Sequence, residues 1–92
     1  MSARRTRLSI YIDILNSVKT QEIYEGRAKI TKIIFDANLP YVRVKERIDK
    51  LIKLGFLEVV DGKYYKLTER GSEALLELVK AQRIIEALGF RV

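Results

Sequence analysis

The 92-residue sequence contains neither cysteine nor histidine. Their absence excludes disulfides, a thiolate nucleophile, the usual zinc sites and the commonest general base. No glycine-rich phosphate loop is present either, so nothing in the chain assembles a catalytic group. We therefore predict that the protein is not an enzyme, and we expect no metal, cofactor or small-molecule ligand.

Long hydrophobic runs are also missing. No apolar stretch approaches the roughly 18–20 residues that a membrane span needs, and no signal-peptide core follows the basic N-terminus. We therefore expect a cytoplasmic location and no membrane partner. With 92 residues and 48% hydrophobic composition, the chain is long enough for one domain with one core. Methionine, asparagine and glutamine are scarce while 33% of the residues are charged, which indicates a thermophilic source.

Acidic residues are fewer than basic ones, with 12 Asp and Glu against 18 Lys and Arg, and the net charge is +6. Such an excess favours a polyanionic partner, above all nucleic acid, although it also serves solubility. Residues 1–7 carry three arginines and no acid. This N-terminal arm either touches phosphates or a minor groove, or is a frayed, solvated terminus.

The segment 40–54 predicts the helix around which the other elements are arranged. Val44, Ile48 and Leu51 recur at spacings of four and three residues and form a stripe that must be buried. The opposite face carries Val42, Arg43, Glu46, Asp49, Lys50 and Lys53. A helix anchored on one face and basic on the other suits a nucleic-acid groove, but any amphipathic surface helix shows the same pattern.

Two helices are predicted before this one, the first over 8–19 and the second over 27–36. The residues between them break the pattern, and 23–24 is the candidate for a short strand. The segment 37–39 then forms a tight connection before Pro40, which suits the first turn of a helix. Two helices joined by about three residues, the second of them basic, have the helix-turn-helix spacing.

A β-hairpin is predicted over 56–67. Gly55 is suited to end the preceding helix, because glycine tolerates the left-handed conformation at that position. Asp61 and Gly62 predict a two-residue type I′ turn, which needs positive φ at both positions. The resulting register pairs Val60 with Lys63 and Glu58 with Tyr65.

Residues 68–88 predict a long last helix with Thr68 as its N-cap. Gly71 is unfavourable in a first turn, which is explained if a neighbouring segment passes close to it. A heptad-like seam follows at Ala74, Leu78, Ala81, Ile85 and Leu88. The seam predicts a homodimer through this helix; the alternative is that the helix folds back onto the first helix of its own domain.

The order of these elements is that of a winged helix-turn-helix domain. We therefore predict an α+β, mainly α fold. It divides into a basic N-terminal arm at 1–7, the winged domain at 8–67 and a C-terminal dimerisation helix at 68–92.

Several short segments within 8–88 resemble a known family. They are Thr31-Lys32-Ile33, Ala37-Asn38-Leu39, Leu51 with Gly55-Phe56-Leu57, and the most specific stretch, Tyr65 to Gly71. These segments resemble the small archaeal winged-helix DNA-binding proteins of the 10a group and related predicted transcriptional regulators. The resemblance implies a homodimer whose C-terminal helices pair as an antiparallel coiled coil and whose two winged domains bind double-stranded DNA.

The candidate DNA contacts fall into two chemical groups. Arginine can bond guanine O6 and N7 together and glutamate can accept from cytosine N4, so the candidate base contacts are Arg43, Glu46 and Arg47. The candidate backbone contacts are all cationic: Lys45, Lys50 and Lys53 on the same helix, Lys29 and Lys32 on the preceding one, Lys63 in the hairpin, and Arg4 and Arg5 in the arm. The alternative is a solvated face held by the helix pairs Glu46–Lys50 and Asp49–Lys53.

Together these features predict a double-stranded DNA-binding protein, either a transcription regulator or a chromatin-architectural protein. The helix 40–54 would lie in the major groove, with the hairpin as a wing on the backbone. The alternative is a protein–protein interaction module in a transcription or replication assembly, in which the basic helix is merely a solvated face.

Overall fold

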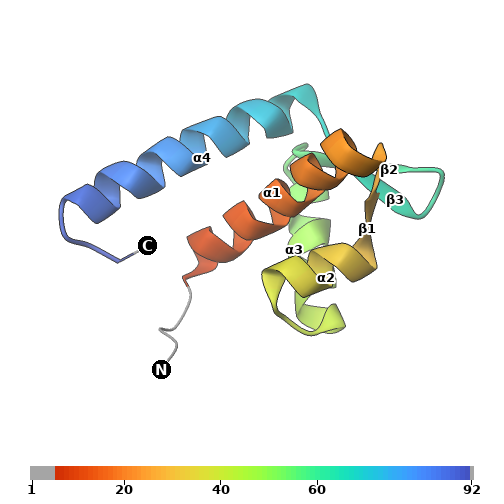
Figure 1. Ribbon diagram of the computed structural model, residues 1–92, viewed down its shortest axis with the longest axis horizontal. Coiled ribbons are helices and arrows are strands. Elements are labelled where there is room, and N and C mark those ends of the chain that lie inside the picture. The colour runs from red at the N-terminus through yellow and green to blue at the C-terminus, as the bar shows by residue number, and fades with distance from the viewer. Residues whose placement is uncertain (1–5, 92) are drawn as a thin grey trace.

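The computed structural model describes residues 6–91, and this part of the chain forms four α-helices and a three-stranded antiparallel sheet (Figure 1). The elements are α1 (Arg7–Glu25), β1 (Ala28–Lys29), α2 (Ile30–Ala37), α3 (Tyr41–Lys53), β2 (Leu57–Val60), β3 (Tyr64–Leu67) and α4 (Glu69–Ala87). The strand order in the sheet is β1-β3-β2. The predicted α+β, mainly α winged helix-turn-helix fold is confirmed.

Helix α1 extends to Glu25 and therefore includes the segment that was expected to break it. It starts after Thr6, whose hydroxyl caps the first turn, and ends at Gly26 in the left-handed conformation (φ 82°). The prediction of a strand at 23–24 is wrong. No glycine or proline interrupts the helix before Gly26, and the buried side chain of Gln21 is satisfied by partners that only the folded chain supplies.

Gln21 joins the end of α1 to the start of the helix-turn-helix. Its Oε1 accepts the Lys29 N–H at 2.9 Å, and its Nε2 donates to Ser17 Oγ at 3.1 Å. The Ser17 hydroxyl in turn donates to the Asp36 carboxylate at 2.7 Å. This chain of hydrogen bonds connects α1, β1 and α2, so it fixes the position from which α2 begins.

We expect Gln21→Leu to lower the free energy of unfolding by about 2 kcal/mol, because the Lys29 N–H loses its acceptor inside the protein. Urea unfolding monitored by circular dichroism measures the change. Gln82→Leu is the matched control, because Gln82 is half-buried on α4 and should change stability by no more than about 0.5 kcal/mol. Equal effects of the two substitutions would contradict the role of the hydrogen bonds.

The short strand of the winged fold lies at Ala28–Lys29, after the predicted position, and pairs with β3. Helix α2 consequently starts at Ile30 rather than at residue 27. It ends in a left-handed Asn38 (φ 55°), and Pro40 is the N-cap of α3 rather than a residue of its first turn. The tight helix-turn-helix connection is confirmed, with its boundaries shifted by one residue.

The hairpin forms as predicted, but its register is wrong by one residue. Asp61 and Gly62 both have positive φ (54° and 71°), yet the loop also includes Lys63. The observed pairs are Leu57–Leu67, Glu58–Lys66, Val59–Tyr65 and Val60–Tyr64. The predicted register would have placed Leu57 opposite Lys66, whereas the observed one buries Leu57 and Leu67 together.

The core lies around α1, which contacts each of the other helices (Figure 1). The stripe predicted for α3 is confirmed, since Val44, Ile48 and Leu51 are buried. Helix α4 packs on α1 through Leu75, which is also buried. The core therefore holds α3 by one face and leaves its other face to solvent.

Candidate nucleic-acid interface

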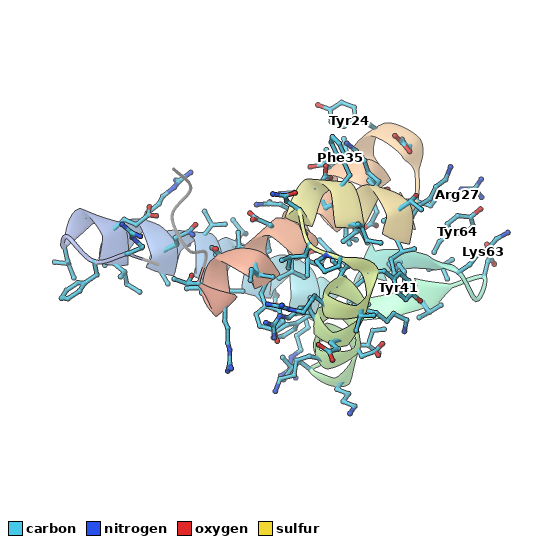
Figure 2. The ribbon with its side chains drawn as sticks, turned by 90° about the horizontal axis from the view of Figure 1, so that it is seen from below. Tyr24, Arg27, Phe35, Tyr41, Lys63 and Tyr64 are labelled. Atoms are coloured by element: carbon cyan, nitrogen blue, oxygen red, sulfur yellow. The ribbon has the colours of Figure 1, made fainter. Side chains whose placement is uncertain are left out.

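The outer face of α3 is exposed along its whole length, and α3 extends below α2 in the lower part of Figure 2. The exposed residues are those predicted for this face: Val42, Arg43, Glu46, Asp49, Lys50 and Lys53. Helix α3 ends at a C-cap followed by Gly55 with φ 83°, as predicted. The Gly55 N–H donates to the Ile52 carbonyl at 3.0 Å and the Phe56 N–H donates to the Leu51 carbonyl at 2.9 Å.

The ion pair on this face differs from the predicted pairs. Lys45 binds Asp49, with 2.8 Å between Nζ and Oδ1, and this hydrogen bond raises the pKa of Lys45. The expected pairs Glu46–Lys50 and Asp49–Lys53 are not formed. Arg43, Lys50 and Lys53 make no ion pair with any residue from 6 to 91. Three cations are thus free to meet an anion from outside.

Arg47 does not share the exposed face with Arg43 and Glu46. It is half-buried, and its guanidinium lies 5.5 Å from the centre of the Tyr11 ring on α1. Its buried Nε has no hydrogen-bond partner within the described part of the chain. The structure therefore does not group Arg47 with the other candidate base contacts.

The remaining candidate cations lie on other elements. Lys29 is exposed on β1, and Lys32 on α2 pairs with Asp36 at 3.1 Å. Lys63 is exposed in the hairpin loop, with Nζ 5.4 Å from the centre of the Tyr64 ring. Arg4 and Arg5 lie outside the described residues.

Sequence reasoning missed Arg27 as a member of this group. Its guanidinium lies 4.3 Å from the centre of the Tyr64 ring, so it stands beside the hairpin although it follows α1 in the chain. A basic residue directly after a helix-ending glycine was the available signal. The sequence did not reveal that β1 pairs with β3, so it could not predict that Arg27 lies beside Tyr64.

The predicted dimer seam lies along one side of α4. Leu78, Ala81 and Ile85 are half-buried, and Ala74 is half-buried as well. Leu88 is 70% exposed, and Ile84 and Phe90 nearby are 62% and 66% exposed. The N-terminal half of α4 folds back onto α1, whereas its C-terminal half extends beyond the domain (Figure 1).

The described residues contain neither a cluster of metal ligands nor a membrane-spanning helix. Between residues 6 and 91, no three acidic, histidine or cysteine side chains gather into a group that could hold a metal ion. None of the helices in that range combines the length and the apolar character needed to cross a membrane.

Comparison with known proteins identifies the family. A family model described as winged helix-turn-helix matches residues 4–86. The chain belongs to the winged helix-turn-helix family. The chain is also 35% identical over 79 residues to the uncharacterized protein MJ0290 of Methanocaldococcus jannaschii. The match covers 86% of this chain but 34% of that protein, so the chain spans about a third of its relative's length.

Two solved structures show the same fold. The winged helix-turn-helix chain superposes on Sso10a-2, a DNA-binding protein from Sulfolobus solfataricus, with a TM-score of 0.74 and 28% identity, covering 91% of this chain and 85% of that one. This match confirms the resemblance to the 10a group. The MarR family transcriptional regulator SPO1453 from Silicibacter pomeroyi shares the fold at 19% identity, with a TM-score of 0.64 over 88% of this chain and 57% of that one.

Proposed function

We propose that this winged helix-turn-helix protein binds double-stranded DNA through the outer face of α3. The observation that carries the proposal is the set of three unpaired cations, Arg43, Lys50 and Lys53, on the exposed face of a helix whose other face is locked into the core. The major groove admits one α-helix, so a rigidly anchored helix with a basic outer face matches its shape and charge. The description of Sso10a-2 as a DNA-binding protein supports this choice.

Each part of the domain has a distinct role in this proposal. Arg43 and Glu46 lie in the N-terminal half of α3 and reach base edges, while Lys50 and Lys53 contact phosphates. The loop 61–63 carries Lys63 and meets the backbone as the wing. Affinity comes largely from the release of counterions when these cations replace them. A preferred palindromic site would indicate a transcription regulator, and strong binding to any sequence would indicate an architectural role.

The first test is the affinity for a fluorescent duplex across a series of salt concentrations. We expect the native chain to show a steep slope of log affinity against log salt. Lys50→Ala, Lys53→Ala and Lys63→Ala together should lower the affinity about tenfold and make the slope shallower by about 2–3, because each lost phosphate contact removes about 0.9 from the slope.

A charge-matched variant controls for net charge. Lys19→Ala, Lys80→Ala and Arg83→Ala remove the same charge from exposed positions on α1 and α4 and should preserve most of the slope. If the native chain does not bind the duplex at low salt, the proposal fails. If both triple variants lose affinity equally, the contact is a general charge effect and not a property of α3.

We also propose that the protein is a homodimer formed through the C-terminal half of α4. Ile84, Leu88 and Phe90 are more than half exposed there, although large apolar side chains are normally covered in a stable protein. An antiparallel pairing of two α4 helices would cover them and would present two copies of α3 on one side of a duplex. Two-fold symmetry would then set the spacing between the DNA half-sites.

A further inference from the structure

Aromatic side chains are exposed where α1, α2 and the hairpin meet. Tyr24 at the end of α1 is 80% exposed, and Phe35 on α2 is 76% exposed. Lys32 lies over the Phe35 ring at 5.0 Å, and Arg27 and Lys63 both lie over the Tyr64 ring. We call this set the aromatic–basic surface, and its members are Tyr24, Arg27, Lys32, Phe35, Lys63 and Tyr64.

These residues follow one another around one end of the domain. Figure 2 shows Tyr24 and Phe35 at its upper edge, with Arg27, Tyr64 and Lys63 along its right-hand side. The fold brings together the segments that carry these residues, since Lys29 pairs with Tyr64 across the sheet and its N–H donates to Gln21, one turn before Tyr24. The surface is therefore built at one end of the domain, from elements other than α3.

Duplex DNA gives no reason for these rings to be exposed. Its base faces are stacked inside the helix, and a phosphate backbone needs cations rather than aromatic rings. An unpaired strand differs, because each base offers a face that stacks on an aromatic ring while cations follow the backbone. The exposed rings of Tyr24 and Phe35, with Arg27, Lys32 and Lys63 at the same end of the domain, match that arrangement.

We infer that the aromatic–basic surface binds single-stranded DNA. Bases stack on Phe35 and Tyr24, and Arg27 and Lys63, which lie over the Tyr64 ring, hold the adjoining phosphates. A second copy of the chain is a poorer occupant, because self-pairing of this surface would bring Arg27, Lys32 and Lys63 of both copies together. The inference concerns a surface that shares only Lys63 with the proposed duplex interface; only the choice of DNA over RNA rests on the proposed duplex binding.

The experiment measures the fluorescence anisotropy of a labelled 20-nucleotide oligo-dT and of a labelled duplex with the same set of full-length proteins. We expect the native protein to bind oligo-dT. Tyr24→Ala with Phe35→Ala should lower that affinity at least about tenfold, because stacking on two rings is lost. The salt slope should stay unchanged, since the substitutions remove no cation. The affinity for the duplex should also stay unchanged.

Two variants make the result specific. Leu76→Ala removes an exposed apolar side chain from α4, away from the proposed dimer seam, and should not change oligo-dT binding. Lys50→Ala with Lys53→Ala should weaken duplex binding while preserving oligo-dT binding. If the native chain binds oligo-dT but not the duplex, the proposed function is refuted. If it binds the duplex but not oligo-dT, this inference is refuted.

Other outcomes would also overturn the inference. Oligo-dT binding that survives the Tyr24 and Phe35 substitutions would place the strand elsewhere. Tighter binding of oligo-uridine than of oligo-dT would exclude the choice of DNA. A fall in oligomer size of the Phe35→Ala variant in sedimentation would show that a second copy covers the surface.

Discussion

Gly71→Ala is expected to destabilise the protein by about 3 kcal/mol, although alanine is the better helix former. The backbone of α4 passes so close to the connection between α3 and β2 that a Cβ at residue 71 would lie 1.9 Å from the Phe56 carbonyl oxygen. This contact is with main chain rather than with a flexible side chain, so relief requires the two segments to separate.

The separation would also break the hydrogen bonds around Thr68. Its N–H donates to the Phe56 carbonyl at 3.1 Å, and its hydroxyl donates to the Gly55 carbonyl at 2.5 Å. The same hydroxyl accepts the Gly71 N–H at 2.9 Å as the N-cap of α4. These hydrogen bonds join the first turn of α4 to Gly55 and Phe56, which follow α3. The substitution is therefore expected to weaken all of them together.

Urea unfolding at a fixed protein concentration measures the effect. Ser72→Ala is the control, because Ser72 is exposed in the same turn and the change should be neutral or stabilise by up to about 0.5 kcal/mol. A gain of stability of up to about 1 kcal/mol in Gly71→Ala, as helix propensity alone gives, would show that the close approach to Phe56 does not constrain the helix.

Leu88→Lys is expected to raise the dissociation constant of the proposed dimer about a hundredfold or more. A buried leucine contributes about 1.5–3 kcal/mol, and two-fold symmetry counts each substitution twice. Leu88 is 70% exposed in the single chain, so the substitution should not unfold the domain itself. Sedimentation velocity over a range of protein concentrations measures the dissociation constant.

Leu88→Lys should also lower the affinity for duplex DNA. Once the subunits separate, the second copy of α3 no longer benefits from a high local concentration near the duplex, so duplex affinity falls as well. Leu76→Lys is the matched control, since Leu76 is 59% exposed on the same helix, about 120° away around its axis. A native chain that stays monomeric, or equal weakening by both variants, would refute the proposed seam.

The sequence by itself determined those features that depend on residues within about one helical turn. The buried stripe of Val44, Ile48 and Leu51 follows from helical spacing, and it was predicted correctly. The positive φ of Gly55, and of Asp61 with Gly62, follows from local backbone chemistry. The order of elements, and with it the winged helix-turn-helix fold, rests on these local signals.

The tertiary structure alone decided which distant groups meet. Gln21 lies beyond the predicted end of α1, and its side chain accepts the Lys29 N–H, a partner that the sequence does not reveal. Leu57 pairs with Leu67 rather than with Lys66, which shifts the hairpin register by one residue. This pairing is favoured because it buries both leucines. Arg47 turns toward Tyr11, and Arg27 reaches Tyr64, by contacts between elements far apart in the chain. Local periodicity places a side chain on a face of its helix, but the neighbouring elements determine whether that face is open to a ligand.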